Sequence, residues 1–222
     1  MSNNNKTTKK SGLFDGLSRQ NIVLMSGIAI APVAVVANNF HNSAALALGF
    51  TIIALLGVTA CRFIPKKIVY TVRVIIYALI AGLAVIPAYL ALRHFYGMEM
   101  VENLGVYLPL MAVNPLILTK TETRFSLRPP HLMLVELLGY IMGFNIVCVA
   151  VGTTRDVLVN RQIGAIHFDV GFEVPALSST FGGLIIIGIA AGAFRQQYNM
   201  RKARKIRKAE KERLRRKMIE EL

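Results

Sequence analysis

Residues 104–114 read LGVYLPLMAVN, and residues 27–32 read GIAIAP. Both stretches are apolar, and each contains a glycine and a proline. Proline lacks a backbone N–H and clashes with the preceding helical turn. A helix broken in this way exposes polar backbone at membrane depth, which is tolerated only where protein or a cavity surrounds it. The two stretches therefore predict two broken helices. The residues that mark the breaks are Gly27, Pro32, Gly105, Pro109 and Asn114.

The apolar residues around these breaks gather into six runs. The 222-residue chain is 54% hydrophobic and 17% charged, too little polar surface for a soluble domain of this length. The longer runs have about 20 residues, enough to cross a hydrocarbon layer of roughly 30 Å as a helix. The runs are Ile22–Ala37, Ser43–Cys61, Val74–Leu92, Leu104–Leu118, Leu132–Gly152 and Ala176–Phe194. They predict an all-α integral membrane protein with six transmembrane helices.

The first and fourth runs are the short, interrupted ones, and two long runs follow each of them. Because three spans make an odd number, a second copy of such a unit is inserted with opposite topology. The pattern is typical of two inverted three-helix repeats with a functional site near their interface at the midplane. The alternative is two unrelated proline kinks, since proline is common in membrane helices.

The charge distribution predicts the topology. The net charge is +14, and lysines and arginines alternate between rich and poor segments along the chain. Because basic residues are retained on the cytoplasmic side, this alternation indicates six spans with both termini in the cytoplasm. We expect a polar cytoplasmic arm over residues 1–20, a six-helix membrane domain over residues 21–195, and a basic cytoplasmic helical tail over residues 196–222.

The basic tail has two interpretations. From Arg195 onward the chain carries 12 of its 26 lysines and arginines and 4 of its 12 acidic residues, a net charge of +8. Such charge favours topological retention and attraction to anionic lipid over recognition of nucleic acid, which we do not expect as a partner. A patchy apolar stripe at Ala203, Ile206, Leu214, Met218 and Leu222 leaves a role in binding a partner open.

At the fourth break the sequence resembles the membrane subunits of the Rnf complex and of the Na⁺-translocating NADH:quinone reductase (Nqr). Residues 104–114 are similar to the family's LG-x-x-x-PL-x-x-x-N, and residues 118–122, LTKTE, to the LGRAE of the RnfE/NqrD branch. Residues 152–156, GTTRD, resemble its GAIRE. Further matches are Gly12-Leu13-Phe14, Asn21, Glu136, Gly143 and Phe144. The matches span residues 13 to 195 in the family's order.

The resemblance implies a six-helix subunit of two inverted halves in the bacterial cytoplasmic membrane. Family members pair with a sibling subunit and hold a [2Fe–2S] cluster between them, within a larger electron-transport complex that translocates Na⁺ or H⁺. The family places one cluster cysteine immediately before the first-break proline and another just after the fourth-run asparagine. Here those positions are Ala31 and Pro115, which cannot ligate iron. We therefore expect this chain alone to bind no cofactor and no metal.

Other residues offer weaker candidates. Cys61 and Cys148 lie in the second and fifth runs, away from both breaks. We expect them to be small buried side chains rather than substitute ligands for a cluster. Glu136 is the one acidic residue inside a span, where a carboxylate marks an ion path by default, although Arg128 offers it a structural pairing. Lys120, Glu122 and Arg124 form either a solvated charge cluster or a docking surface for a cytoplasmic partner.

These observations predict a divergent, non-catalytic membrane subunit of an Rnf/Nqr-type ion-translocating electron-transport complex. No catalytic residues are expected, since the sequence has no nucleotide-binding or hydrolase motif. Two alternatives stay open. One is a small transporter or ion channel that reuses the inverted-repeat scaffold, and the other is a membrane anchor whose tail recruits a cytoplasmic partner.

Overall fold

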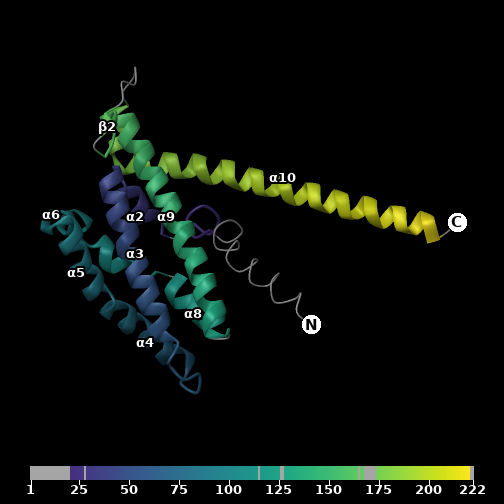
Figure 1. Ribbon diagram of the computed structural model, residues 1–222, viewed down its shortest axis with the longest axis horizontal. Helices are drawn as coiled ribbons and strands as arrows, with labels where there is room; N and C mark the ends of the chain where they lie inside the picture. The colour runs from purple at the N-terminus through teal and green to yellow at the C-terminus, as the bar shows by residue number, and fades with distance from the viewer. Residues whose placement is uncertain are drawn as a thin grey trace.

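The computed structural model describes residues 21–27, 29–114, 116–125, 128–164, 166–167 and 174–220, and most of them are helical (Figure 1). The predicted cytoplasmic arm, residues 1–20, lies outside the described residues. The helices are α2 (Ile30–Val36), α3 (Phe40–Cys61), α4 (Tyr70–Leu83), α5 (Val85–Tyr96), α6 (Met98–Leu104), α7 (Tyr107–Leu110), α8 (Thr121–Thr123), α9 (Pro130–Asn160) and α10 (Thr180–Glu220).

Shorter elements complete the chain. A π-helical turn, η2 (Leu116–Lys120), precedes α8, and a 3₁₀ turn, η4 (Pro175–Ser178), precedes α10. Two residues each from β1 (Gln162–Ile163) and β2 (Ile166–His167) pair antiparallel after α9. The all-α prediction is thus correct apart from this small pair.

Three helices of the described chain are long and apolar enough to cross a membrane: α3, the continuous stretch Tyr70–Tyr96, and α9. They correspond to the second, third and fifth predicted runs. The first and fourth runs are divided into short helices, and the apolar part of α10 ends at Arg195. The structure therefore shows a membrane protein with several apolar helices, while six complete spans remain a prediction.

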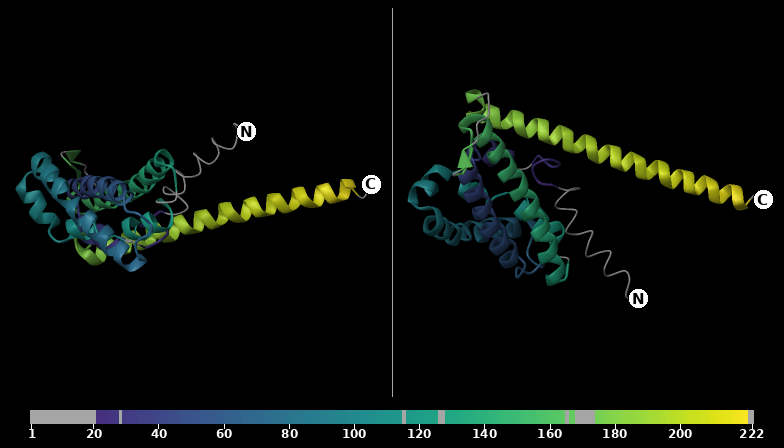
Figure 2. Two further views of the ribbon diagram at one scale, coloured as in Figure 1. Left: turned by 90° about the horizontal axis from the view of Figure 1, so that it is seen from below. Right: turned by 45° about the horizontal axis from the view of Figure 1, so that its top comes forward.

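The helices α3 and α9 form the centre of the bundle and lie side by side in Figures 1 and 2. Phe50 of α3 packs on Phe144 of α9, with ring centroids 4.3 Å apart. Near the other end, Gly152 of α9 approaches α3 so closely that a Cβ there would lie 2.7 Å from the Asn39 carbonyl oxygen. Glycine at this position therefore sets the distance between the two central helices.

The stretch Tyr70–Tyr96 lies on the outside of this pair. Only 22% of its most apolar window is buried, against 56% in α3 and α9. Its exposed side chains recur at helical spacing and face away from the bundle, as expected for a surface against lipid or another subunit. They include Val72, Ile75, Leu79, Ile86 and Leu90. The break between α4 and α5 at Ala84 follows from Pro87, which cannot donate to the carbonyl of Leu83 four residues earlier.

The first and fourth runs are interrupted at their glycines rather than at their prolines. Gly27 and Gly105 have φ angles of 69° and 49°, which favour glycine, and Ala29 adopts the left-handed region at 62°. Pro32 and Pro109 instead lie in the first turn of α2 and α7, where the missing N–H would have no helical partner anyway. Proline therefore starts the second half of each broken segment, and the mechanism expected from the sequence is corrected in this respect.

The beginning of α10 packs against α2. Gly183 touches the backbone of Ala34, and a Cβ at this position would clash with the Ala34 carbonyl oxygen. Farther along, Arg195 donates to the carbonyl oxygens of Leu24 and Met25, at 3.1 and 2.9 Å. The first segment and the apolar part of α10 are thus held together at both ends.

We expect Gly183→Ala to destabilise the protein and to loosen α10 from α2, because the added methyl group has no space against the Ala34 backbone. Overpacking of this kind costs about 1–3 kcal/mol. The matched control is Gly188→Ala on the same helix, where no atom lies within 4 Å of the added carbon. Thermal unfolding in detergent measures both variants, and equal midpoints would contradict the packing described here.

Candidate functional site

A cavity of about 500 Å³ lies where the two broken segments meet. Gly27 and residues 29–32 line one side, and residues 110, 111, 113 and 114 line the other, although the two stretches are far apart in the sequence. The lining residues are Gly27, Ala29, Ile30, Ala31, Pro32, Leu110, Met111, Val113, Asn114 and Leu184. Most of these side chains are apolar, and Asn114 contributes the one side-chain amide. Of the residues that mark the predicted breaks, Gly105 and Pro109 lie outside the lining.

One of the two positions that the sequence singled out for the family's cluster lies at the cavity. Ala31 is part of its lining, and Asn114 immediately precedes Pro115, which itself lies outside the described residues. Among the described lining residues there is no thiol, imidazole or carboxylate. The part of the chain that the structure describes also contains no group of three or more histidine, cysteine, aspartate or glutamate side chains able to hold a metal ion.

The two cysteines lie elsewhere. Both are free and buried, and neither lines the cavity. The Cys148 thiol donates to the Ser43 carbonyl oxygen at 3.5 Å, between α9 and α3, and the Cys61 thiol donates to the Tyr77 carbonyl oxygen at 3.7 Å. Both thiols are thus used in helix packing.

Arg155 holds the end of the first broken segment. Its side chain is fully buried near the end of α9. The guanidinium donates to the carbonyl oxygens of Ala34 and Ala37, both at 2.9 Å, at the point where α2 ends. It also donates to the carbonyl oxygens of Leu177, Ser178 and Ser179, at 2.7 to 3.0 Å, just before α10. All three guanidinium nitrogens therefore pair with backbone that leaves regular helix.

Arg62 has the corresponding place at the other end of the bundle. It follows α3 directly, and its Nη1 donates to the carbonyl oxygens of Arg128, at 2.7 Å, and Phe125, at 3.3 Å. These carbonyls follow α8, where the second broken segment ends. An arginine after α3 thus holds the segment before α9, and an arginine at the end of α9 holds the segment before α3.

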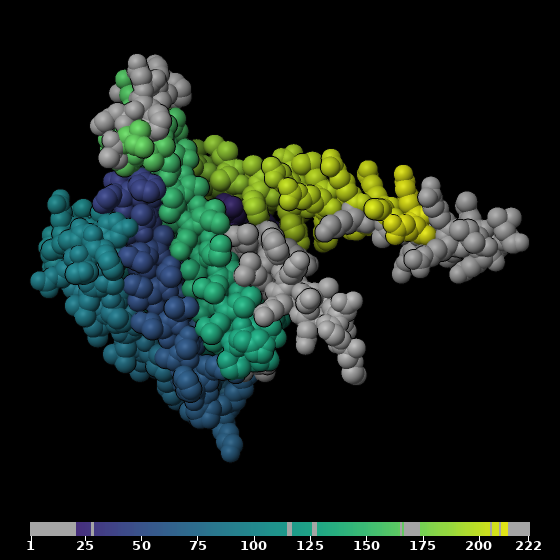
Figure 3. Space-filling view, in the orientation of Figure 1, coloured from purple at the N-terminus to yellow at the C-terminus, as the bar shows by residue number. Residues whose placement is uncertain are grey.

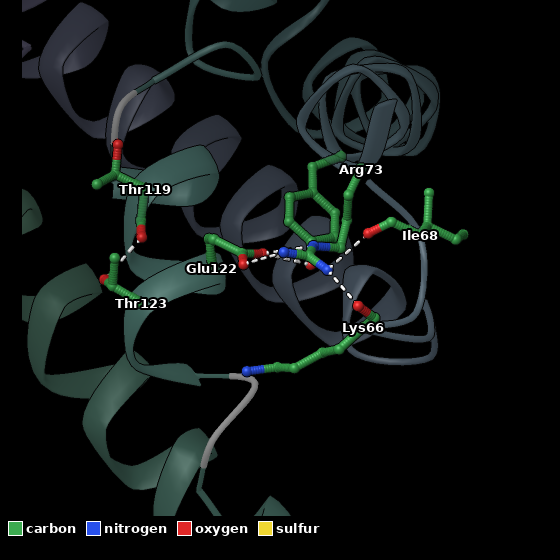
Figure 4. A network of polar contacts seen from close by, with 7 residues as sticks. Lys66, Ile68, Arg73, Thr119, Glu122 and Thr123 are labelled. Atoms are coloured by element: carbon green, nitrogen blue, oxygen red, sulfur yellow. Dashed lines mark hydrogen bonds and ion pairs between the residues drawn. The ribbon is translucent and has the colours of Figure 1, made fainter. Parts of the chain in front are cut away.

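Glu122 belongs to a network that fixes the loop between α3 and α4 (Figure 4). Its carboxylate pairs with Arg73 and accepts a hydrogen bond from the Tyr77 hydroxyl at 3.0 Å. Arg73 also donates to the carbonyl oxygens of Lys66, at 2.8 Å, and Ile68, at 3.0 Å. Burial alone would raise the pKa of Glu122, but the hydrogen bonds from Arg73 and Tyr77 and the charges of Arg73 and Lys66 outweigh it and lower this pKa.

Glu136 is completely buried in the first turns of α9 and pairs with Arg124 and with Arg128, the latter at 3.2 Å. Arg128 is the partner that the sequence offered for a structural role. Glu136 does not line the cavity. Of the three residues considered for cytoplasmic docking, Glu122 and Arg124 take part in these ion pairs, and the Lys120 ammonium lies 5.6 Å from the ring centroid of Tyr140.

Sequence reasoning missed the roles of Arg62, Arg73 and Arg155. Each lies at the end of an apolar run, and none was expected to hold backbone carbonyls, although Arg155 is part of the stretch 152–156 that resembles the family. A usable signal was present in Arg155, because an arginine at the end of a span needs partners and no acidic residue lies one helical turn away from it. Its backbone partners lie more than 20 residues away and follow only from the fold.

A comparison with protein families identifies the scaffold. The model of the family described as "Rnf-Nqr subunit, membrane protein" matches residues 10–198, most of the chain. The chain belongs to the Rnf-Nqr family. Two residues that carry this resemblance touch each other in the structure: the Asn21 side-chain amide donates to the Gly143 carbonyl oxygen at 3.0 Å. This contact places the start of the first segment of the Rnf-Nqr fold against the middle of α9.

Among curated proteins, the Rnf-Nqr chain is similar to the E-type subunit of the ion-translocating oxidoreductase complex of Sodalis glossinidius, with 28% identity over 151 residues. It is also similar to proteins of the same name from Yersinia pestis and Yersinia pseudotuberculosis, each with 24% identity over 156 residues. The alignments cover 68% or 69% of this chain. They span 65% or 66% of the relatives, slightly less than two thirds of their length.

We expect Arg155→Gln to destabilise this Rnf-Nqr chain by on the order of 3 kcal/mol, because a buried acceptor left without a donor costs about 1–3 kcal/mol and two buried carbonyls, those of Ala34 and Ala37, lose their donor. Arg62→Gln should have a smaller effect, since that side chain is only half-buried. Denaturant titration in mixed micelles measures both variants against the exposed control Arg93→Gln. A loss for Arg155→Gln no larger than for the control would contradict this assignment.

The lowered pKa of Glu122 predicts a pH dependence of stability. A carboxyl whose pKa is lower in the folded state stabilises the protein above its ordinary pKa, and this contribution is lost as the pH falls through the lowered pKa. Glu122→Gln should therefore lower the unfolding temperature near neutral pH, and the difference from wild type should shrink as the pH falls below about 4.5. Thermal unfolding across this range is the measurement, with the exposed Glu102→Gln as control. A difference that is independent of pH would refute the ion-pair role.

Proposed function

We propose that this chain is a membrane subunit of an ion-translocating oxidoreductase complex, and that it binds no [2Fe–2S] cluster of its own. The observation that carries the proposal is the cavity at the meeting point of the two interrupted segments, lined by Ala31 and Asn114 and without a thiol among its described residues. The names of the relatives support assignment to such a complex. We place the chain in the bacterial cytoplasmic membrane with both termini in the cytoplasm.

The arrangement of the segments supports two inverted halves. The first half would consist of the interrupted segment before α3, then α3 and α4–α5, and the second of α6 to α8, then α9 and the apolar part of α10. In each half a glycine with positive φ precedes a proline in the first turn of the next short helix. The reciprocal contacts of Arg62 and Arg155 add a third correspondence.

The donor set of the cavity does not fit an iron–sulfur cluster. Such clusters need thiolate ligands or, in some cases, imidazole. The described lining offers neither, and the thiols of Cys61 and Cys148 are buried in other helix contacts. Electron transfer through a cluster held by this chain alone is therefore not part of the proposal. We propose instead that the chain supplies the scaffold for one half of a paired membrane unit.

The exposure of the cavity favours such pairing. Gly27, Ala31, Leu110, Val113 and Leu184 line the cavity and are exposed, so it opens at the surface of the bundle. An apolar opening of this kind is covered by lipid or by another protein. A sibling Rnf/Nqr-type subunit packed here would close the cavity against its own broken segments.

A transporter or ion channel on the same scaffold is the second candidate, and the buried carboxylate of Glu136 is its motivating feature. Ion pairs with Arg124 and Arg128 and a position away from the cavity support a structural role for this carboxylate instead. Ion flux in liposomes that is abolished by Glu136→Gln would favour the transporter over the redox-complex subunit.

The test is an anaerobic, gentle detergent purification of the tagged chain from its native membrane. We expect flavoprotein and iron–sulfur subunits to co-purify, identified by mass spectrometry. Isolation of the chain alone or as a homodimer, under conditions that preserve a known membrane complex from the same cells, would overturn the assignment to a redox complex.

A second measurement addresses the cluster. The chain expressed without partners should contain no stoichiometric iron or acid-labile sulfide and give no signal of a reduced [2Fe–2S] centre in electron paramagnetic resonance. The matched variant Ala31→Cys/Pro115→Cys places cysteine at both family positions. Its iron content is compared with that of the wild type to recognise iron that binds adventitiously. One cluster per wild-type chain would show that other ligands substitute, and the proposal would fail.

A further inference from the structure

The second part of α10 is a basic helix that the family assignment does not explain. The family match ends at residue 198, whereas α10 continues to Glu220. Figures 1 and 2 show one uninterrupted helix that leaves the bundle and extends far from it. The coloured part of this protrusion in Figure 3 stands clear of the bundle. We call residues 195–220 the basic rod. It follows the apolar part of α10 without a break.

The rod is attached to the bundle through Arg195. The Arg195 side chain donates hydrogen bonds to the carbonyl oxygens of Leu24 and Met25, which fixes the point where α10 leaves the bundle. Nearly every described side chain from Arg195 to Glu212 is exposed, with Tyr198 half-buried. At 1.5 Å per residue the rod is about 39 Å long. Packing against the rest of the described chain does not account for its order or its charge.

The reach of the rod argues against lipid as the partner of its distal half. This reach follows from the six-span topology proposed above, in which the apolar part of α10 crosses the membrane. A membrane helix tilts by at most about 40°, so an unbroken continuation of that span rises at least about 1.1 Å per residue. Lys211 would then stand about 18–24 Å beyond the apolar layer. The headgroup region accounts for about 6 Å of this distance, and the Debye length is about 8 Å. Five of the 12 basic residues lie at Lys211 or beyond, outside the effective field of an anionic bilayer.

The charge pattern indicates an acidic partner. Five pairs of like charges lie four residues apart along the rod, including Arg204–Lys208 and Arg207–Lys211, and only three pairs of opposite charges do so within the helix. Like charges at this spacing repel each other and destabilise an isolated helix. A complementary negative surface relieves this repulsion.

The apolar residues of the rod favour a protein over a nucleic acid. Met200 and Ile206 are 47% and 50% exposed, and with Ala203 they follow a three-residue spacing along one side. Exposed apolar side chains on one helix face are typical of a helix that binds in a protein groove. Proteins that bind single-stranded nucleic acid use aromatic stacking, and the sequence after Tyr198 contains no aromatic residue.

We propose that the basic rod is a docking helix for the acidic surface of a cytoplasmic protein, held by Lys and Arg side chains around a narrow apolar strip that includes Met200 and Ile206. This partner site is separate from the cavity between the broken segments. Failure of the docking proposal would leave the proposed role of the membrane domain unchanged.

The experiment places a photo-cross-linking amino acid at Ile206 in the full-length chain, expressed in its native membrane. We expect a protein adduct whose cross-linked peptide is rich in aspartate and glutamate. Reversal of four exposed charges, Arg204→Glu, Arg207→Glu, Lys208→Glu and Lys211→Glu, should reduce this adduct at least five-fold. The matched control exchanges lysine and arginine at the same four positions, which keeps the charge, and should retain the adduct.

A second measurement tests the lipid alternative directly. The chain contains no tryptophan, so Ile206→Trp gives a single fluorophore on the rod. Its emission maximum should be the same in vesicles of phosphatidylcholine and in vesicles that also contain phosphatidylglycerol. A blue shift in the anionic vesicles, adducts with lipid or RNA alone, no adduct, or a protein adduct that survives charge reversal would each overturn the proposal.

Discussion

Backbone N–H and C=O groups that leave a helix inside an apolar layer must form hydrogen bonds within the protein, and the rest of this structure depends on how these bonds are made. The Arg155 guanidinium donates hydrogen bonds to five carbonyl oxygens, at the end of α2 and in the turn before α10. A guanidinium suits this task because it carries five donors in one rigid plane, whereas a lysine offers three donors at a point. One side chain of α9 thereby holds two other chain segments against that helix, and the buried carbonyls of Ala34 and Ala37 at the first break have a donor. Arg62 acts in the same way for the second broken segment.

The two anchored segments share a cavity. Arg155 of α9 holds the end of the first broken segment and Arg62 after α3 holds the end of the second, and the interrupted middles of both segments line one cavity. Small residues then leave the space open, since Gly27, Ala29 and Ala31 lack the volume to fill it. Ala29 also adopts a left-handed conformation that costs a non-glycine residue roughly 1 kcal/mol. Strain of this kind persists only where the surrounding structure imposes it.

The sequence predicted the broad architecture because apolar run length and charge alternation are local properties. It located the runs that became α3, α4–α5 and α9, and it found both interruptions. It could not assign their cause correctly, because a proline in a first turn and a proline within a helix look alike in one dimension, and only the φ angles of Gly27 and Gly105 distinguish them. The contacts of the arginines also could not be predicted from the sequence. Arg155 and Ala34 are 121 residues apart, and arginine at a span end is equally compatible with a solvated charge.

The opening of the cavity bears on what covers this chain in the membrane. The cavity of about 500 Å³ is open at the bundle surface and is not an enclosed void, so in a membrane it is in contact with whatever covers that surface. Because its described lining is apolar apart from Asn114, apolar groups suit this opening, such as lipid chains or the side chains of another subunit. A largely apolar hollow at the surface is therefore consistent with the proposed subunit that packs against another membrane protein of its complex.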